Sequence, residues 1–168
     1  MSYVDHFRHA DDVIAHLNTV VPGLPDPLLK TKYAGFVTVA AVTVYELAIK
    51  DIFCEFGRKK HKILGAFSES YFKKINGRVT LDHIRKDYCL RYGDVYVTKF
   101  KTQLESSNKT HLAAHRRDLR SSYSNLIVWR NAFAHEGAVP ATVTYSEVVQ
   151  AYQDGKEVIH SLAATMIR

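Results

Sequence analysis

The chain has few cysteines and none of the spacings by which cysteines hold metals. Cys54 and Cys89 are the only two among 168 residues, and they lie far apart in the sequence. This excludes a disulfide-stapled secreted fold and a zinc-finger-like module, and it favours a reducing cytoplasm as the compartment. We expect both thiols to lie in the core.

Long apolar runs are also missing. The most apolar stretch, residues 36–49, is interrupted by Thr38, Thr43 and Glu46. It is too short for a membrane span and suits a buried helix, so no membrane association is expected. The N-terminus lacks a basic lead followed by an apolar core, so we also expect no signal peptide.

Signatures of several enzyme classes are absent. The chain has no glycine-rich phosphate loop, no nucleophile elbow and no paired-carboxylate motif. His111 and His115 are four residues apart and could place two metal ligands on one helix face, but no third ligand is evident. We expect a solvated basic face there, and the sequence predicts no metal and no other cofactor.

The composition that remains is that of an ordinary globular protein. It is 46% hydrophobic and 24% charged, and the length suits a single domain over residues 1–168. Lysine and arginine number 23 against 17 acidic residues, a formal net charge of +6. This excess favours an anionic partner such as nucleic acid, although proteins that bind none are often modestly basic too.

Helical periodicity dominates the chain. The apolar pattern is clearest over residues 110–135, where Leu112, Leu119, Leu126 and Phe133 fall seven apart. Residues 106–108 are expected to form a polar break before that helix, and a strand competes locally over residues 36–45. The expected helices cover residues 3–18, 27–57, 63–75, 81–92, 94–105 and 110–135, with a last one from 145. The fold class is therefore all-α, an up-and-down helical bundle.

Turn and capping residues set the helix ends. Asp26 followed by Pro27 is a start signal, and Gly137 is a stop signal. Thr144 and Glu147 have the spacing of a capping box ahead of the last helix. Gly155 lies on the apolar stripe of that helix, which indicates a close approach to a neighbouring helix.

The most informative stretch is residues 129–137, at the end of the 110–135 helix. Asn131 and His135 are four apart and share a helix face, within about 40° of each other, while Arg130 projects from an adjoining face. A histidine can transfer protons near neutral pH, and an arginine can hold a phosphate with two parallel hydrogen bonds. RNA cleavage needs a base, an acid and a cation, which two such motifs meeting across a two-fold axis would supply.

The sequence from Arg130 to His135, with Trp129 before it and Gly137 after it, resembles the motif of the HEPN superfamily, which commonly reads "RNxxAHxG". The resemblance implies a small helical bundle that acts as a metal-independent endoribonuclease. It further implies a homodimer whose two motifs form one cleft for single-stranded RNA, with a 2′,3′-cyclic phosphate as product. Arg130, Asn131 and His135 are then the catalytic residues, and Glu46 is an acidic residue that could orient Arg130.

The chain resembles small standalone HEPN proteins such as the MAE_28990-like and RiboL-PSP-associated groups. These are linked to toxin–antitoxin and phage-defence systems, so an antitoxin or defence-system partner protein is expected in the cytoplasm. One residue departs from the pattern. HEPN toxins that are silenced by nucleotidyltransferase antitoxins carry a tyrosine two positions after the histidine, where this chain has Gly137.

The same residues could instead have structural roles only. Arg130 could be a surface arginine in a salt bridge, His135 a histidine at a helix end, and Glu46 a partner of Lys50. Arg116, Arg117 and Arg120 could form a solvated face, or they could guide RNA from the same helix as the motif. The alternative function is a non-catalytic HEPN-type module that binds RNA or a partner protein.

Overall fold

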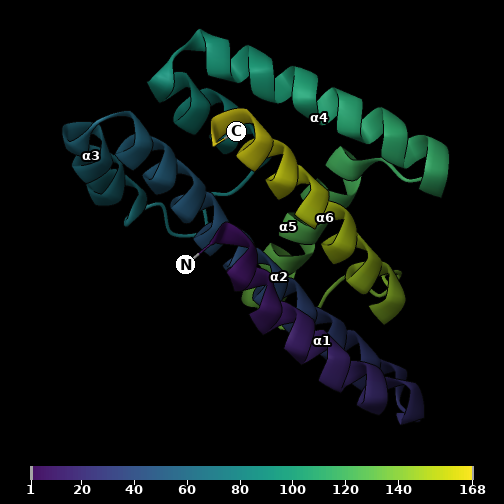
Figure 1. The fold of residues 1–168 in the computed structure, drawn as a ribbon. Helices are drawn as coiled ribbons and strands as arrows, with labels where there is room; N and C mark the ends of the chain where they lie inside the picture. The colour runs from purple at the N-terminus through teal and green to yellow at the C-terminus, as the bar shows by residue number, and fades with distance from the viewer. Residues whose placement is uncertain (1, 168) are drawn as a thin grey trace.

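The computed structural model describes residues 2–167, and every regular element in that range is helical (Figure 1). The expected all-α bundle is confirmed. Short helical turns at Tyr3–His6 and Val21–Gly23 flank the first helix, and two more at His83–Tyr88 and Cys89–Tyr92 precede α4. The main helices are α1 (Phe7–Val20), α2 (Pro27–Lys60), α3 (Lys62–Phe72), α4 (Asp94–His115), α5 (Leu119–Glu136) and α6 (Tyr145–Met166).

The longest helix, α2, is the centre of the bundle. It begins where the sequence predicts, because the Asp26 carboxylate accepts a hydrogen bond from the backbone N–H of Leu28 and Pro27 occupies the first turn. It packs against α1, α3, α5 and α6 and lies between α1 and α6 (Figure 1). Residues 36–45 are helical despite their β-branched side chains, because tertiary burial outweighs local propensity.

Three stacked tyrosines join α2, α5 and α6 in the core. The Tyr45 ring lies 5.5 Å from the Tyr123 ring and 5.8 Å from the Tyr152 ring, and all three are fully buried. The Tyr45 hydroxyl donates to the backbone carbonyl of Tyr152. A Cβ at Gly155 would overlap the Tyr45 ring, so the close helix approach predicted at this glycine is confirmed.

The cysteines differ in burial. Cys89 is fully buried, and burial raises the pKa of its thiol to about 12. Cys54 is half-buried on α2, and its pKa is also raised by burial. The expectation of two core thiols is therefore met by Cys89 and only in part by Cys54.

The expected helix over residues 110–135 and the break at 106–108 are both wrong. α4 continues through 106–108 to His115, and the chain turns at Arg116, which has a left-handed φ of 59°. The Asn108 side chain is 6% exposed and points to the next helix, where its amide donates to Asp118 and its oxygen accepts from the Leu119 N–H. Asn108, which the sequence suggests as part of a helix break, is therefore a buried residue whose hydrogen bonds connect α4 to the start of α5.

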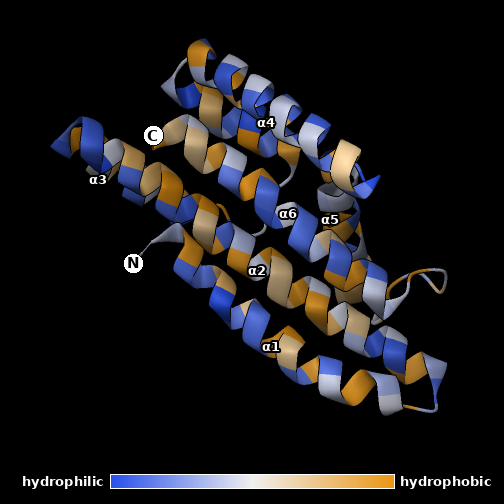
Figure 2. Cartoon of the chain, turned by 45° about the vertical axis from the view of Figure 1, so that its right-hand side comes forward, coloured by the Kyte–Doolittle hydropathy of each residue, from blue (hydrophilic) through white to orange (hydrophobic). Residues whose placement is uncertain are grey.

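The seven-residue spacing of apolar residues led to the wrong helix because the spacing continues across the turn at Arg116. Leu112 is 45% exposed at the end of α4, whereas Leu119 and Leu126 are fully buried in α5. Figure 2 shows α4 as largely hydrophilic, and only Phe100, Leu104 and Asn108 are buried in it. A spacing of seven therefore linked residues on two separate helices.

The segment between α3 and α4 also departs from expectation. α3 ends at Phe72 rather than at residue 75, and the predicted 81–92 helix is two short pieces of different winding. Asn76 and Gly77 both have positive φ, 29° and 75°, so the chain reverses there. This turn brings residues 75–79 against α2 and α5, beside the motif.

Candidate active site at the end of α5

α5 presents the motif on its last turns. The helix begins at Asp118, whose carboxylate accepts from the Ser121 N–H at 2.9 Å. It ends at Gly137, where φ is 73° and the N–H bonds to the carbonyl of Phe133. Gly137 is thus the stop that the sequence predicts, and the motif residues lie within the final two turns.

A glycine in α2 holds this end of α5 close. The Phe133 ring lies over Gly35, where any Cβ would overlap the ring, and it packs edge-on against Phe36 at 5.4 Å. A glycine within an otherwise apolar helix, here Gly35, could have indicated this contact, but the sequence-based prediction did not include it. The contact fixes the rotation of α5 and so decides which way each motif side chain points.

Arg130 faces a hollow of about 450 Å³ between α2, α5 and the turn at 76–77. Its Nη2 donates a long hydrogen bond, 3.4 Å, to the Gly77 carbonyl. Its buried Nε has no acceptor among residues 2–167. An unsatisfied buried donor costs roughly 1–3 kcal/mol, and such groups call for an explanation, a functional one included.

Glu46 lies on the opposite wall of the same hollow. Its Oε2 accepts from the Gly77 N–H, and its Oε1 accepts from Lys50 Nζ at 2.6 Å. The backbone of Gly77 therefore links Glu46 and Arg130, because its N–H donates to the carboxylate and its carbonyl accepts from the guanidinium. No direct ion pair joins Glu46 to Arg130 within residues 2–167. The pairing with Lys50 is present as one alternative expected, and an orienting role for Glu46 stays a prediction.

Asn131 and His135 point away from this hollow. Both are exposed, and neither side chain makes a hydrogen bond or ion pair within residues 2–167. They share the exposed face of α5 with Val128, which is 60% exposed. The expected geometry of Asn131 and His135 is thus present, and Arg130 projects to the neighbouring side. Arg130 has no acidic partner in the described part of the chain, so nothing there supports its interpretation as a surface arginine in a salt bridge.

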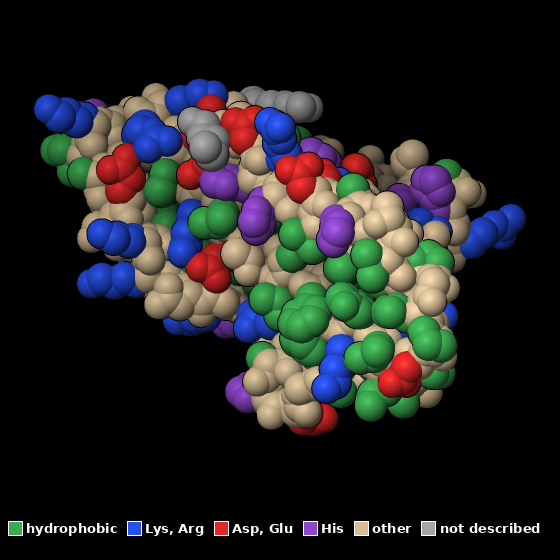
Figure 3. All heavy atoms as spheres, turned by 90° about the horizontal axis from the view of Figure 1, so that it is seen from below, with side chains coloured by type: hydrophobic (Ala, Val, Ile, Leu, Met, Phe, Trp, Pro, Cys, Tyr) green, Lys and Arg blue, Asp and Glu red, His purple; other side chains and the backbone are tan. Residues whose placement is uncertain are grey.

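Apolar side chains surround the motif. Phe36 and Val39 on α2 are 53% and 40% exposed, and Val39 also lines the Arg130 hollow. Leu28 and Leu29 extend the exposed apolar set toward the start of α2. Seen from below, hydrophobic side chains gather over the side where the N-terminal half of α2 lies (Figure 3). Solvent-exposed apolar surface of this kind beside a polar motif is typical of an interface.

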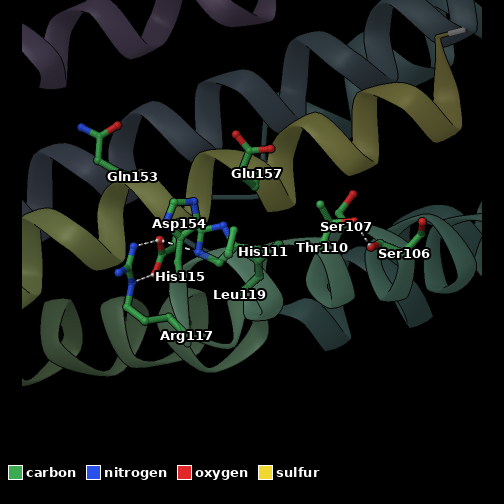
Figure 4. Close-up of a pocket in the computed structure, with 11 residues that line it drawn as sticks. Ser106, Ser107, Thr110, His111, His115, Arg117, Leu119, Gln153, Asp154 and Glu157 are labelled. Atoms are coloured by element: carbon green, nitrogen blue, oxygen red, sulfur yellow. Dashed lines mark hydrogen bonds and ion pairs between the residues drawn. The ribbon is translucent and has the colours of Figure 1, made fainter.

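The arginines expected to guide RNA are placed differently. Arg116 and Arg117 lie in the turn before α5, so their expected place on the motif's helix is wrong; Arg120 is in α5. The Arg117 guanidinium grips Asp154 of α6 through two hydrogen bonds of 2.9 Å (Figure 4). Arg120 pairs with Asp118 at 3.2 Å. All three lie near the start of α5, and Arg120 is roughly 15 Å along the helix axis from Arg130.

His111 belongs to the same cluster, so the expected solvated face is wrong there. The His111 side chain is 13% exposed, with Nε2 2.9 Å from Asp154, whereas His115 is exposed with its ring 4.5 Å from that of His111. Asp154 is 1% exposed, and the sequence-based prediction did not include it. A single acidic residue between Ala151 and Val158, on the buried stripe of the helix, was the signal that could have indicated it. No set of three or more histidine, cysteine, aspartate or glutamate side chains within residues 2–167 is arranged to hold a metal ion.

An all-α bundle that carries an arginine, an adjoining asparagine and a histidine at an exposed helix end defines a HEPN-type domain. The sequence model of the RiboL-PSP-HEPN family matches residues 5–167, so the chain belongs to this family of the HEPN superfamily. The family is associated with RNA and with ribonuclease activity. No curated protein and no solved structure matches the chain. Among the helices of residues 2–167, none has the length and apolar character to span a bilayer.

Proposed function

We propose that this protein is a metal-independent endoribonuclease that cuts single-stranded RNA. The observation that carries the proposal is the arrangement at the end of α5. Arg130 is held in a hollow by a turn that Glu46 braces, while Asn131 and His135 stand unpaired on the adjoining exposed face. A phosphate at the mouth of the hollow would meet a guanidinium on one side and a proton-transfer group on the other.

The reaction needs two proton transfers. A base takes the proton of the 2′-hydroxyl, whose oxygen attacks phosphorus as the bond to the 5′-oxygen breaks, and an acid returns a proton to that leaving oxygen. The products are a 2′,3′-cyclic phosphate and a 5′-hydroxyl. Arg130 stabilises the negative charge of the transition state, and Asn131 positions the substrate. One chain offers one motif histidine, so the second transfer falls to His135 of a second copy.

A homodimer is therefore part of the proposal. The exposed side chains of Phe36, Val39 and Val128 lie beside the motif and would be covered if two copies met on this face. A stable interface buries roughly 1,200–2,000 Å² in total, and apolar residues dominate its centre. Pairing on this face would place both Arg130 hollows and both His135 side chains in one cleft.

Arg116 and Arg120 are proposed as more distant contacts for the RNA backbone, because Arg116 is exposed in the turn before α5 and Arg120 is exposed in the first turn of α5. Arg117 is a weaker candidate because its guanidinium is engaged with Asp154. A cytoplasmic toxin–antitoxin or phage-defence role, with an antitoxin or other partner protein, completes the proposal. It is supported by membership of the RiboL-PSP-HEPN family.

The test is cleavage of single-stranded RNA by purified protein in EDTA, compared with His135→Ala. We expect cleavage by the wild type, a 2′,3′-cyclic phosphate end and no cleavage by the variant. Activity that EDTA abolishes and magnesium restores would contradict the assignment. Light scattering gives the second measurement, and a fully active monomer at micromolar concentration would exclude the shared cleft.

A second function has one observation in its favour. Nη2 of Arg130 is bonded to the Gly77 carbonyl and its Nε is buried, so part of the guanidinium is used by the fold. A non-catalytic module that binds RNA or a protein would tolerate this. Binding of RNA by wild type without any cleavage, unchanged in His135→Ala, would select this function over the ribonuclease.

A further inference from the structure

A second hollow, of about 330 Å³, adjoins the turn that contacts Arg130. Ile75 and Arg78 line this hollow, whereas Asn76 and Gly77 between them line the hollow of Arg130. On the other wall, α3 contributes Phe67, Ser70 and Tyr71, and Lys74 follows the end of that helix. The two hollows are therefore neighbours that share one four-residue turn, and we call this one the Phe67 hollow.

Flat side chains form a column that includes two rings lining the Phe67 hollow, Phe67 and Tyr71, and the Arg91 guanidinium, which is not among the lining side chains. The Arg91 guanidinium lies 4.1 Å from the centre of the Tyr71 ring. The Tyr71 and Phe67 rings are within 11° of parallel, with centres 6.3 Å apart. Phe67 is 49% exposed and is the open end of the column. Exposed aromatic faces of this kind are the surfaces on which single-stranded nucleic acids stack their bases.

The charges around the Phe67 hollow suit a phosphate backbone. Lys74 is exposed and has no ion pair within residues 2–167, and no acidic side chain lines the hollow. Arg78 pairs with Asp87 at 2.8 Å, but the Arg78 side chain is 57% exposed and Asp87 is 35% exposed, so water weakens the pair and a phosphate can compete. Aromatic rings interleaved with unpaired basic groups favour RNA over a protein as the occupant.

We propose that the Phe67 hollow binds one base of single-stranded RNA beside the nucleotide that is cut. This rests on the proposed ribonuclease function and adds a substrate-binding subsite to it. An RNA chain that crosses the 75–78 turn places a phosphate at Arg130 and the adjoining base on Phe67. The volume is at the lower end of the range for small-ligand sites, which suits one nucleoside and excludes a duplex.

Three substitutions on α3 test the subsite. Phe67→Ala removes the stacking surface and Phe67→Trp keeps one. Ile63→Ala is the matched control because Ile63 is 74% exposed on the same helix and lies outside the hollow. Each is made in a His135→Ala background, so RNA stays intact, and is titrated with a labelled single-stranded hexaribonucleotide. Circular dichroism of each variant checks that the helices are retained.

We expect Phe67→Ala to weaken RNA binding about 5- to 150-fold, Phe67→Trp to retain it, and Ile63→Ala to stay within about twofold. In the cleaving protein, KM should rise by the same factor while kcat stays within about threefold. Because Phe67 is half-exposed, its loss should leave the fold intact.

Equal RNA affinity of Phe67→Ala and its parent would overturn the subsite, including the case in which this surface receives a protein instead. Failure of the parent to bind any single-stranded RNA would overturn it too. If the wild type does not cleave RNA but Phe67→Ala still loses binding, the ribonuclease proposal fails while the subsite stands. The two failures are therefore distinguishable.

Discussion

Replacement of Asp154 by asparagine should destabilise the fold and leave the chemistry at α5 untouched. Asp154 is 1% exposed and accepts two hydrogen bonds from Arg117 and one, of 2.8 Å, from Ser122. His111 faces the same carboxylate. This one side chain on α6 therefore joins the end of α4, the turn after it and the start of α5; Figure 4 shows it between His111 and Arg117.

The expected magnitude follows from burial. Removal of one partner of a buried ion pair typically costs about 3–5 kcal/mol, because the other charge is left uncompensated. The Arg117 side chain is 33% exposed, so water recovers part of its solvation. We therefore expect Asp154→Asn to lower the free energy of unfolding by about 2–4 kcal/mol. In a chain of this length that corresponds to a fall in Tm of roughly 5–15 °C.

The effect should depend on pH in a defined direction. Burial alone would raise the pKa of Asp154, but hydrogen bonds from Arg117 and Ser122 outweigh it and hold the pKa below its usual value. A carboxylate with a lowered folded pKa contributes stability above its unfolded pKa, near 3.9, and loses it as the pH falls through the folded pKa. The gap between wild type and Asp154→Asn should thus narrow as the pH falls below about 4.

Urea unfolding followed by circular dichroism at several pH values measures this gap. Glu157→Gln is the matched control, because Glu157 is exposed on the same helix, close to Asp154, and makes no ion pair within residues 2–167. It should change stability by no more than about 0.5 kcal/mol. A loss below about 1 kcal/mol for Asp154→Asn at pH 7, or a gap that widens in acid, would refute the reasoning.

The other predictions concern the motif and the helix contact behind it. His135→Ala should lower the cleavage rate by about 10²–10⁴ with Tm nearly unchanged, and wild-type cleavage by this variant would contradict the catalytic role. Arg130→Lys should cleave as poorly as Arg130→Ala, since an ammonium lacks the planar fork; full rescue would show that charge alone suffices. Gly35→Ala gains roughly 1 kcal/mol of helix propensity but overpacks the Phe133 ring at a cost of about 1–3 kcal/mol, so calorimetry should show a net loss and cleavage should fall. Gly23→Ala, where nothing lies within 4 Å, is its control.

The fold was largely predictable because its helix ends are encoded locally. Asp26 caps α2, Gly137 stops α5, and Thr144 with Glu147 forms the capping box of α6, all as the sequence indicates. The predicted helix ends were wrong where a contact with a residue of another helix outweighed the local sequence pattern. Asn108 reads as a turn residue, but its bonds to Asp118 and Leu119 lie across a helix boundary that no local pattern marks.

The candidate site was predictable in its residue types but only partly in its geometry. Helical spacing places Asn131 and His135 on one face, and the structure has both there, exposed. The surroundings of Arg130 come from segments far away in the sequence, and the rotation of α5 that brings it there depends on Phe133 over Gly35. Short-range periodicity carries no information on such contacts, so the hollow had to be seen in the structure.

The backbone of Gly77 is the link on which the site depends. Its N–H donates to Glu46 and its carbonyl accepts from Arg130, so the φ and ψ of this residue set how the two contacts lie relative to each other. The left-handed φ of 75° at Gly77 makes this orientation accessible, and a side chain there would meet the guanidinium as well as strain the backbone. A turn that reads as a simple helix stop in the sequence therefore sets the position of the arginine. The same turn separates the Arg130 hollow from the Phe67 hollow, so a shift of the turn would move the proposed phosphate contact and the proposed base contact together.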